Sequence, residues 1–133
     1  MNQQDFTERT DCPVDWADLY GRIADEGIIT EFAASFLKNS QTLILSLKSP
    51  IKTHNPDPIE LYAHALKGSA SNMGAITLAK AAWPIEKAAA EKQLDNIDEL
   101  LTACEQAYFA LIALLEQPDW ISQAKHAAEV KTA

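Results

Sequence analysis

The sequence is poor in glycine and cysteine, with 4 and 2 of them among 133 residues. Because alanine and leucine are abundant where glycine is scarce, the composition favours helices. Cys12 and Cys104 do not form a CxxC pair and have no histidine close by in the sequence, which argues against a disulfide framework or a zinc site. Cys104 lies on an apolar helical stripe, so we expect a small core residue there rather than a nucleophile.

The chain also lacks a long hydrophobic run and an excess of positive charge. No apolar segment approaches the roughly 18 residues that span a membrane, and the polar N-terminus has no signal-peptide core. These absences predict a cytoplasmic protein. Asp and Glu number 19 against 11 Lys and Arg, so the net charge is −8. Phosphate backbones and anionic membranes would repel such a chain, which argues against nucleic acids and membrane surfaces as partners.

What the sequence does contain is helical periodicity. Hydrophobic residues recur at three- and four-residue steps along most of the chain, and no alternating strand pattern occurs. Length and an apolar fraction of 47% fit one domain with a single core. We predict an all-α antiparallel four-helix bundle with a short extra N-terminal helix and a tail that forms one more helix or frays. The predicted segments are a flexible arm at 1–13, the bundle at 14–117 and an extension at 118–133, with helices at 15–27, 28–47, 57–73, 75–92 and 96–117.

Particular residues predict where these helices end. Gly27 and Gly74 are expected to terminate helices, whereas Asp57 and Asn96 are expected to start them as the N-caps of capping boxes. The stretch SPIKTHNPDP contains three prolines and is predicted to be a loop. Pro84 lies inside a predicted helix, which it should interrupt with a kink.

Residues 64–75 read HALKGSASNMGA, within a predicted amphipathic helix. On a helical wheel, the polar side of this helix carries His64, Lys67, Gly68 and Ser71. This placement predicts that the imidazole of His64 faces solvent. The opposite side, expected to face the core, carries Ile59, Tyr62, Ala63, Leu66, Ala70 and Met73.

Gly68 and Lys67 make His64 more than an ordinary exposed histidine. A glycine inside a helix costs about 0.8–1.0 kcal/mol relative to alanine. At four residues from His64 it leaves the imidazole open to a bulky partner, although an accident or a close helix contact would also explain it. The Lys67 ammonium, three residues from His64, would favour the neutral, nucleophilic imidazole and steady a phosphoryl group on it. Taken singly, a solvated lysine or histidine is usually inert.

Two classes of site are missing. No serine–histidine pair with an orienting carboxylate can be assigned, which argues against a hydrolytic triad. No GxxxxGK[ST] loop occurs, which argues against ATP binding. The other histidines, His54 in the proline-rich stretch and His126 in the tail, are expected to be solvated and inert.

The stretch HALKGSASNMGA, with Ile85-Glu86 after it, resembles the signature of histidine-containing phosphotransfer domains, over roughly residues 14–117. The resemblance implies a four-helix bundle that takes a phosphoryl group from a receiver-domain aspartate and passes it to another receiver. It also implies that His64 is the phosphoacceptor, that Lys67 stabilises the phosphoryl group and that Gly68 provides steric clearance.

The resemblance further implies a monomeric relay protein without kinase or ATPase activity and without a cofactor or metal of its own. Because the sequence contains no receiver or kinase segment, we expect a free-standing bacterial protein, with a fragment of a longer protein as the alternative. Receiver domains, supplying Mg²⁺, are the implied partners, together with a hybrid sensor histidine kinase. They would dock on the His64 face, near Ser71 and Asn72 and exposed apolar residues of the second helix. Two alternatives stay open: a non-phosphorylated helical adaptor that docks receiver or kinase domains, and a phosphohistidine phosphatase, for which no acid or metal set is visible.

Overall fold

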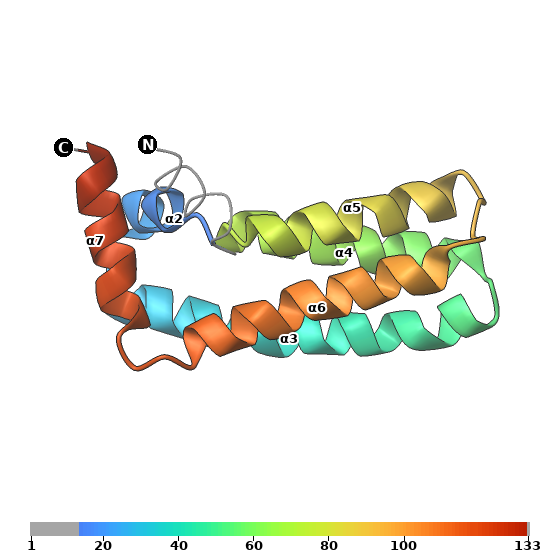
Figure 1. Ribbon diagram of the computed structural model, residues 1–133, viewed down its shortest axis with the longest axis horizontal. Helices are drawn as coiled ribbons and strands as arrows, with labels where there is room; N and C mark the ends of the chain where they lie inside the picture. Colours follow the sequence, from blue (N-terminus) through green and yellow to red (C-terminus); the bar gives the residue numbers. More distant parts are fainter. Residues whose placement is uncertain (1–13, 133) are drawn as a thin grey trace, which may run out of the picture.

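A computed structural model describes residues 14–132, so the predicted arm at 1–13 and Cys12 lie outside the described residues. Within this range the chain forms six helices and no strand, which confirms the all-α prediction. Figure 1 shows α3 to α6 running side by side in alternating directions as a four-helix bundle, with α2 and α7 together at one end. The helices are α2 (Trp16–Ile23), α3 (Glu26–Lys52), α4 (Pro56–Met73), α5 (Ile76–Ala90), α6 (Ile97–Leu115) and α7 (Trp120–Thr132).

The core lies between the four long helices and is built from their apolar faces. In α4 the predicted core side is confirmed, since all of its residues are buried apart from Tyr62, which is half-buried. Cys104 of α6 is buried as well, and burial raises the pKa of its thiol to about 12, as expected for an inert core cysteine. Each large aliphatic side chain fully buried in this way contributes about 1.5–3 kcal/mol. The α4 residues on this face are Ile59, Ala63, Leu66, Ala70 and Met73.

The boundary between the first two helices differs from the prediction at Gly27. The first helix, α2, ends at Ile23, and Ala24, three residues before Gly27, is its C-cap in the left-handed conformation with φ 55°. Asp25 then caps α3, because its side chain accepts a hydrogen bond of 2.9 Å from the backbone N–H of Ile28. Gly27 therefore lies within the first turn of α3 rather than at the end of α2, and its expected role was wrong.

The predicted proline-rich loop is also much shorter than expected. Helix α3 continues through Pro50 to Lys52. The proline removes one helical hydrogen bond, and burial of Pro50 and Ile51 offsets this loss. Helix α4 begins at Pro56, whose fixed φ suits a first helical position. Asp57 lies in the first turn, so its predicted N-cap role was wrong.

The expectations for Asn96 and Pro84 are corrected in part. Asn96 occupies the N-cap of α6, but its side chain makes no capping hydrogen bond, so the predicted capping box does not form. Pro84 does not interrupt α5, which runs as one helix across it. The proline leaves the carbonyl of Lys80 without its usual helical donor, but Ala82 and Ile85 on either side of it are buried and hold the helix together.

Helices α2 and α7 pack against each other at the end of the bundle where α4 finishes (Figure 1). The rings of Trp16 and Trp120 stack with their centroids 5.4 Å apart. Gly74, the predicted end of the third helix, has φ 77° at the C-cap of α4. Its carbonyl accepts a 2.6 Å hydrogen bond from the backbone N–H of Asp15. The segment after Pro118 therefore contains a helix, α7, that packs against α2.

Among residues 14–132, no helix combines the length and the apolar character that a membrane span requires.

Candidate functional site

His64 projects from the outer face of α4, and its side chain is 68% exposed. Its Nδ1 lies 2.8 Å from Oε2 of Glu86 on the neighbouring helix α5. Because a carboxylate accepts hydrogen bonds, this contact fixes the ring proton on Nδ1, which donates to Glu86. In the neutral ring the lone pair then belongs to Nε2, the nitrogen on the side away from Glu86. The site thus presents an oriented, accessible imidazole nitrogen.

The ammonium of Lys67, one turn further along α4, is held by the same carboxylate. Its Nζ lies 2.7 Å from Oε1 of Glu86 and 5.1 Å from the centre of the Trp83 ring. We expected this ammonium to act on the imidazole directly. Instead, Lys67 and His64 each take one oxygen of Glu86, so that a single carboxylate holds both nitrogen-bearing side chains at neighbouring positions.

Glu86 is largely buried, with 15% of its side chain exposed. Burial by itself raises the pKa of the carboxyl, but Lys67 and then His64 outweigh this effect, so the pKa lies below its ordinary range. The group is therefore ionised at neutral pH. Its Oε1 atom makes no hydrogen bond of good geometry among the described residues, so the ion pair with Lys67 is what compensates for its burial.

Reasoning from the residues alone missed Glu86 as the carboxylate that orients the imidazole. It lies 22 residues from His64 in the sequence, on a different helix, and no local spacing connects the two. The signal that pointed to it was the Ile85-Glu86 pair in the family resemblance. The pair His64–Glu86 is not part of a hydrolytic triad, because no serine hydroxyl hydrogen-bonds the ring among residues 14–132.

Gly68 faces open space. Apart from its two chain neighbours and the nearby backbone of α4, a Cβ placed on this residue would have no heavy atom within 4 Å. The alternative that Gly68 allows another helix of the same chain to approach closely is therefore wrong. The open space is next to His64 on the same face of α4, and the steric-clearance role of Gly68 stays a prediction.

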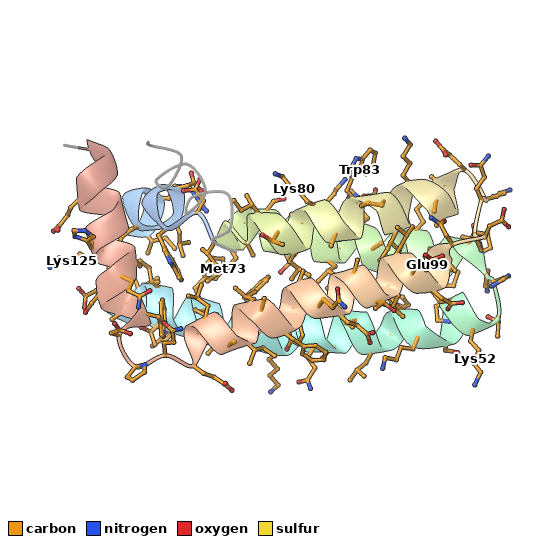
Figure 2. The ribbon with its side chains drawn as sticks, viewed as in Figure 1. Lys52, Met73, Lys80, Trp83, Glu99 and Lys125 are labelled. Carbon is orange, nitrogen blue, oxygen red and sulfur yellow. The ribbon has the colours of Figure 1, made fainter. Side chains whose placement is uncertain are left out.

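The surface around the imidazole is mixed in character. A shallow depression beside it is lined by Asp57, Glu60, Leu61, His64 and Glu86. Figure 2 shows Trp83 projecting outward from α5, and Leu61 is also a large exposed apolar residue. Helix α3 carries the exposed apolar residues Ile28 and Leu45, and their part in docking near His64 stays a prediction.

The remaining candidate residues are placed as follows. Ser71 and Asn72 are exposed on the last turn of α4, where the backbone carbonyl of Asn72 accepts a 2.6 Å hydrogen bond from Arg22 of α2. His54, between α3 and α4, and His126, on α7, are exposed. Within the described range, no group of three or more His, Cys, Asp or Glu side chains is arranged to hold a metal ion.

Comparison with known proteins agrees with the helical-bundle fold. The family model described as the Hpt domain matches residues 31–117. Among solved structures, histidine-containing phosphotransfer protein B from Pseudomonas aeruginosa superposes with a TM-score of 0.72 at 24% identity, covering 80% of this chain and 94% of that one. A putative histidine-containing phosphotransfer protein from rice gives a TM-score of 0.70 at 17% identity, covering 96% and 89%. A search of curated protein sequences found no match.

Proposed function

The chain belongs to the Hpt domain family, and we propose from this membership and from the site geometry that His64 is the phosphoacceptor of a phosphorelay. The observation that carries the proposal is the hydrogen bond from His64 Nδ1 to Glu86, which leaves Nε2 as the nucleophile on an exposed ring. The donor and the final acceptor would both be aspartates on receiver domains.

In the proposed transfer, the Nε2 lone pair attacks the phosphorus of the aspartyl phosphate on the receiver. The N–P bond forms as the P–O bond to the aspartate breaks, and its electron pair returns to the aspartate carboxylate. The ring keeps its proton on Nδ1 and becomes positively charged. Glu86 stabilises that charge, because a hydrogen bond between two ionised groups is roughly twice as strong as one between neutral groups. Transfer to the next receiver runs the same steps backwards.

Lys67 and Gly68 would act on the incoming phosphoryl group and its carrier. The Lys67 ammonium lies within reach of the site, where it can balance the negative oxygens of a phosphoryl group on Nε2. Gly68 leaves room for the receiver to close over the ring. We expect the receiver to bring the Mg²⁺ and the chain itself to act as a co-substrate without kinase or ATPase activity. Ser71 and Asn72 are the proposed contacts at the edge of the docking face.

A phosphotransfer assay tests the proposal. A receiver phosphorylated in the presence of Mg²⁺ should label the protein with phosphate that is labile in acid and stable in alkali, as a phosphoramidate is. The His64→Gln variant should take up none, whereas His126→Gln, which removes another exposed histidine, should be labelled fully. Full labelling of the His64→Gln variant would eliminate His64 as the acceptor. If the protein takes up no label and the His64→Gln variant still supports signalling, the result favours the adaptor function instead.

A further inference from the structure

Trp83 is a large aromatic side chain at a surface position, with half of it exposed to solvent (50%). It lies three residues before Glu86 on α5, so that both side chains share the face that meets Lys67 of α4. The Lys67 ammonium is therefore held from two sides, by the Trp83 ring at 5.1 Å and by Glu86 Oε1 at 2.7 Å. Neither the sequence motif nor the phosphoacceptor proposal accounts for the tryptophan.

An aromatic face attracts a cation through its quadrupole, and tryptophan does so most strongly. Unlike a carboxylate, the ring carries no net charge and does not compete with a phosphoryl group for the ammonium by forming an ion pair. It restricts where the long lysine side chain can go while leaving its charge available. Lysine loses much rotamer freedom when it is held in one place, so a second restraint lowers the entropy cost of placing it at the site.

We propose that Trp83 is a positioning residue for Lys67. The indole ring keeps the Lys67 ammonium next to the phosphoryl site when the Glu86 carboxylate pairs with the imidazolium of His64. The inference rests on the proposed function of His64. In the free protein Glu86 holds both Lys67 and His64. Once Nε2 carries a phosphoryl group, the positively charged imidazole attracts the Glu86 carboxylate more strongly. The Lys67 ammonium over Trp83 then pairs with the phosphoryl oxygens.

The resting contact can be measured without any phosphorylation. Protons that lie over an aromatic face are shifted upfield by the ring current, so the ε-methylene protons of Lys67 should be shifted relative to those of the other lysines. The shift should disappear in Trp83→Leu and persist in Trp83→Phe, which keeps an aromatic face. Random-coil shifts for Lys67 in the unsubstituted protein would overturn the proposal.

The functional consequence can be measured without a receiver. Inorganic phosphoramidate can phosphorylate exposed histidines chemically, by forming an N–P bond as its own P–N bond breaks and ammonia departs. The variant His54→Asn/His126→Gln removes the other two histidines, and asparagine tolerates the positive φ of 54° at residue 54.

The lifetime of phosphorylated His64 is set by its hydrolysis. This step forms a P–O bond from water and breaks the P–Nε2 bond, whose electron pair stays on Nε2. One water proton remains with the phosphate and the other goes to solvent.

In this background Trp83→Leu should shorten the phosphohistidine lifetime about two- to fivefold, the range that corresponds to an exposed cation–π contact. Trp83→Phe should restore part of it. In a Lys67→Met chain, which is expected to have a shorter lifetime already, Trp83→Leu should cause no further change, because the ring acts through Lys67. Equal shortening with and without Lys67 would overturn the proposal, since the tryptophan would then act independently of the lysine.

Docking is the competing role for an exposed tryptophan, and it has a different signature. If Trp83→Leu raises the KM for a phosphorylated receiver but leaves both the lifetime and the Lys67 shifts unchanged, Trp83 is a contact for the partner and the positioning role is wrong. If no receiver transfers to His64, the proposed function fails, whereas the chemical lifetime and the Lys67 shifts still decide the role of Trp83. If phosphoramidate leaves His64 unlabelled, the shifts alone decide it.

Discussion

Tryptophans at two places in this molecule serve opposite purposes. At the end of the bundle, Trp16 is buried and stacks on the half-buried Trp120, which joins α2 to α7. On the outer side of α5, Trp83 is half exposed and contacts a charge rather than another ring. The first region is held by apolar burial and backbone hydrogen bonds. The second is held by one carboxylate and exposes the groups that react.

The difference between the two regions teaches where stability and activity reside. Burial of apolar surface is the main source of folding free energy, and the site on the His64 face contributes little of it because its key side chains are polar and the imidazole is exposed. Substitutions at the α2–α7 end should therefore change stability while transfer persists. Substitutions on the His64 face should change transfer, with smaller effects on stability.

The largest expected change in stability comes from Trp120→Ala. Removing a stacked, half-buried indole should lower the free energy of unfolding by about 3 kcal/mol, since large aromatic-to-alanine changes cost 3–5 kcal/mol in a core. Urea unfolding followed by circular dichroism measures it. The matched variant is Trp83→Leu, which should change stability by less than about 0.5 kcal/mol, as surface substitutions do. Equal losses would remove the distinction between the two regions.

The sequence predicted the bundle well, since helix periodicity reports burial directly. The α4 face from Ile59 to Met73 follows from spacing alone, and so does the exposure of His64 on the opposite side. Helix ends were less predictable. Capping depends on which of several polar residues reaches the free N–H groups, and Asp25 does so at the start of α3 although nothing in its spacing distinguished it from nearby residues.

The site was predictable on one helix and unpredictable across two. The order of His64, Lys67 and Gly68 is a property of α4, whereas the bridge through Glu86 and the contact with Trp83 depend on how α4 and α5 pack. Side chains on different helices meet through tertiary packing, which local periodicity does not encode. This is why Lys67 was expected beside the imidazole and is found beside Glu86.

The largest expected change in transfer, short of replacing His64, comes from Glu86→Gln. The amide can still accept a hydrogen bond from Nδ1 but carries no charge to stabilise the imidazolium. Hydrogen bonds to charged groups contribute about 1.5–3 kcal/mol, and the exposed side of the ring favours the low end, so the transfer rate should fall about tenfold. Rapid-quench phosphotransfer measures it.

The matched control for Glu86→Gln is Glu105→Gln. Glu105 also pairs with a lysine, Lys48, at 3.4 Å, but on the α3–α6 side of the bundle. Its replacement should leave transfer unchanged. A comparable loss in both variants would mean that the rate follows overall charge rather than the carboxylate that holds His64.

A smaller change is expected from Gly68→Gln. Glutamine is a better helix former than glycine, and open space surrounds the Cβ position, so stability should rise by about 0.5–1 kcal/mol. Transfer from a receiver should nevertheless slow several-fold, because the new side chain occupies the approach to His64. Gly21→Gln on α2, where a Cβ also meets nothing within 4 Å, should stabilise the protein without slowing transfer. Unchanged transfer in Gly68→Gln would disprove the clearance role.

The smallest expected effect is a dependence of stability on acid pH at the reactive face. The pKa of Glu86 is lowered in the folded protein, by Lys67 and His64 acting against the opposing effect of burial. The unfolded state therefore binds its proton more readily, and the stabilisation is fully present above the unfolded value of about 4.3 and lost as the pH falls through the lower folded value. Urea titrations from neutral pH downward should show the protein and Glu86→Gln converging in stability at acid pH. A constant difference across that range would show that Glu86 stabilises the fold without its charge, and that the reactive face resembles the α2–α7 end more closely than we infer.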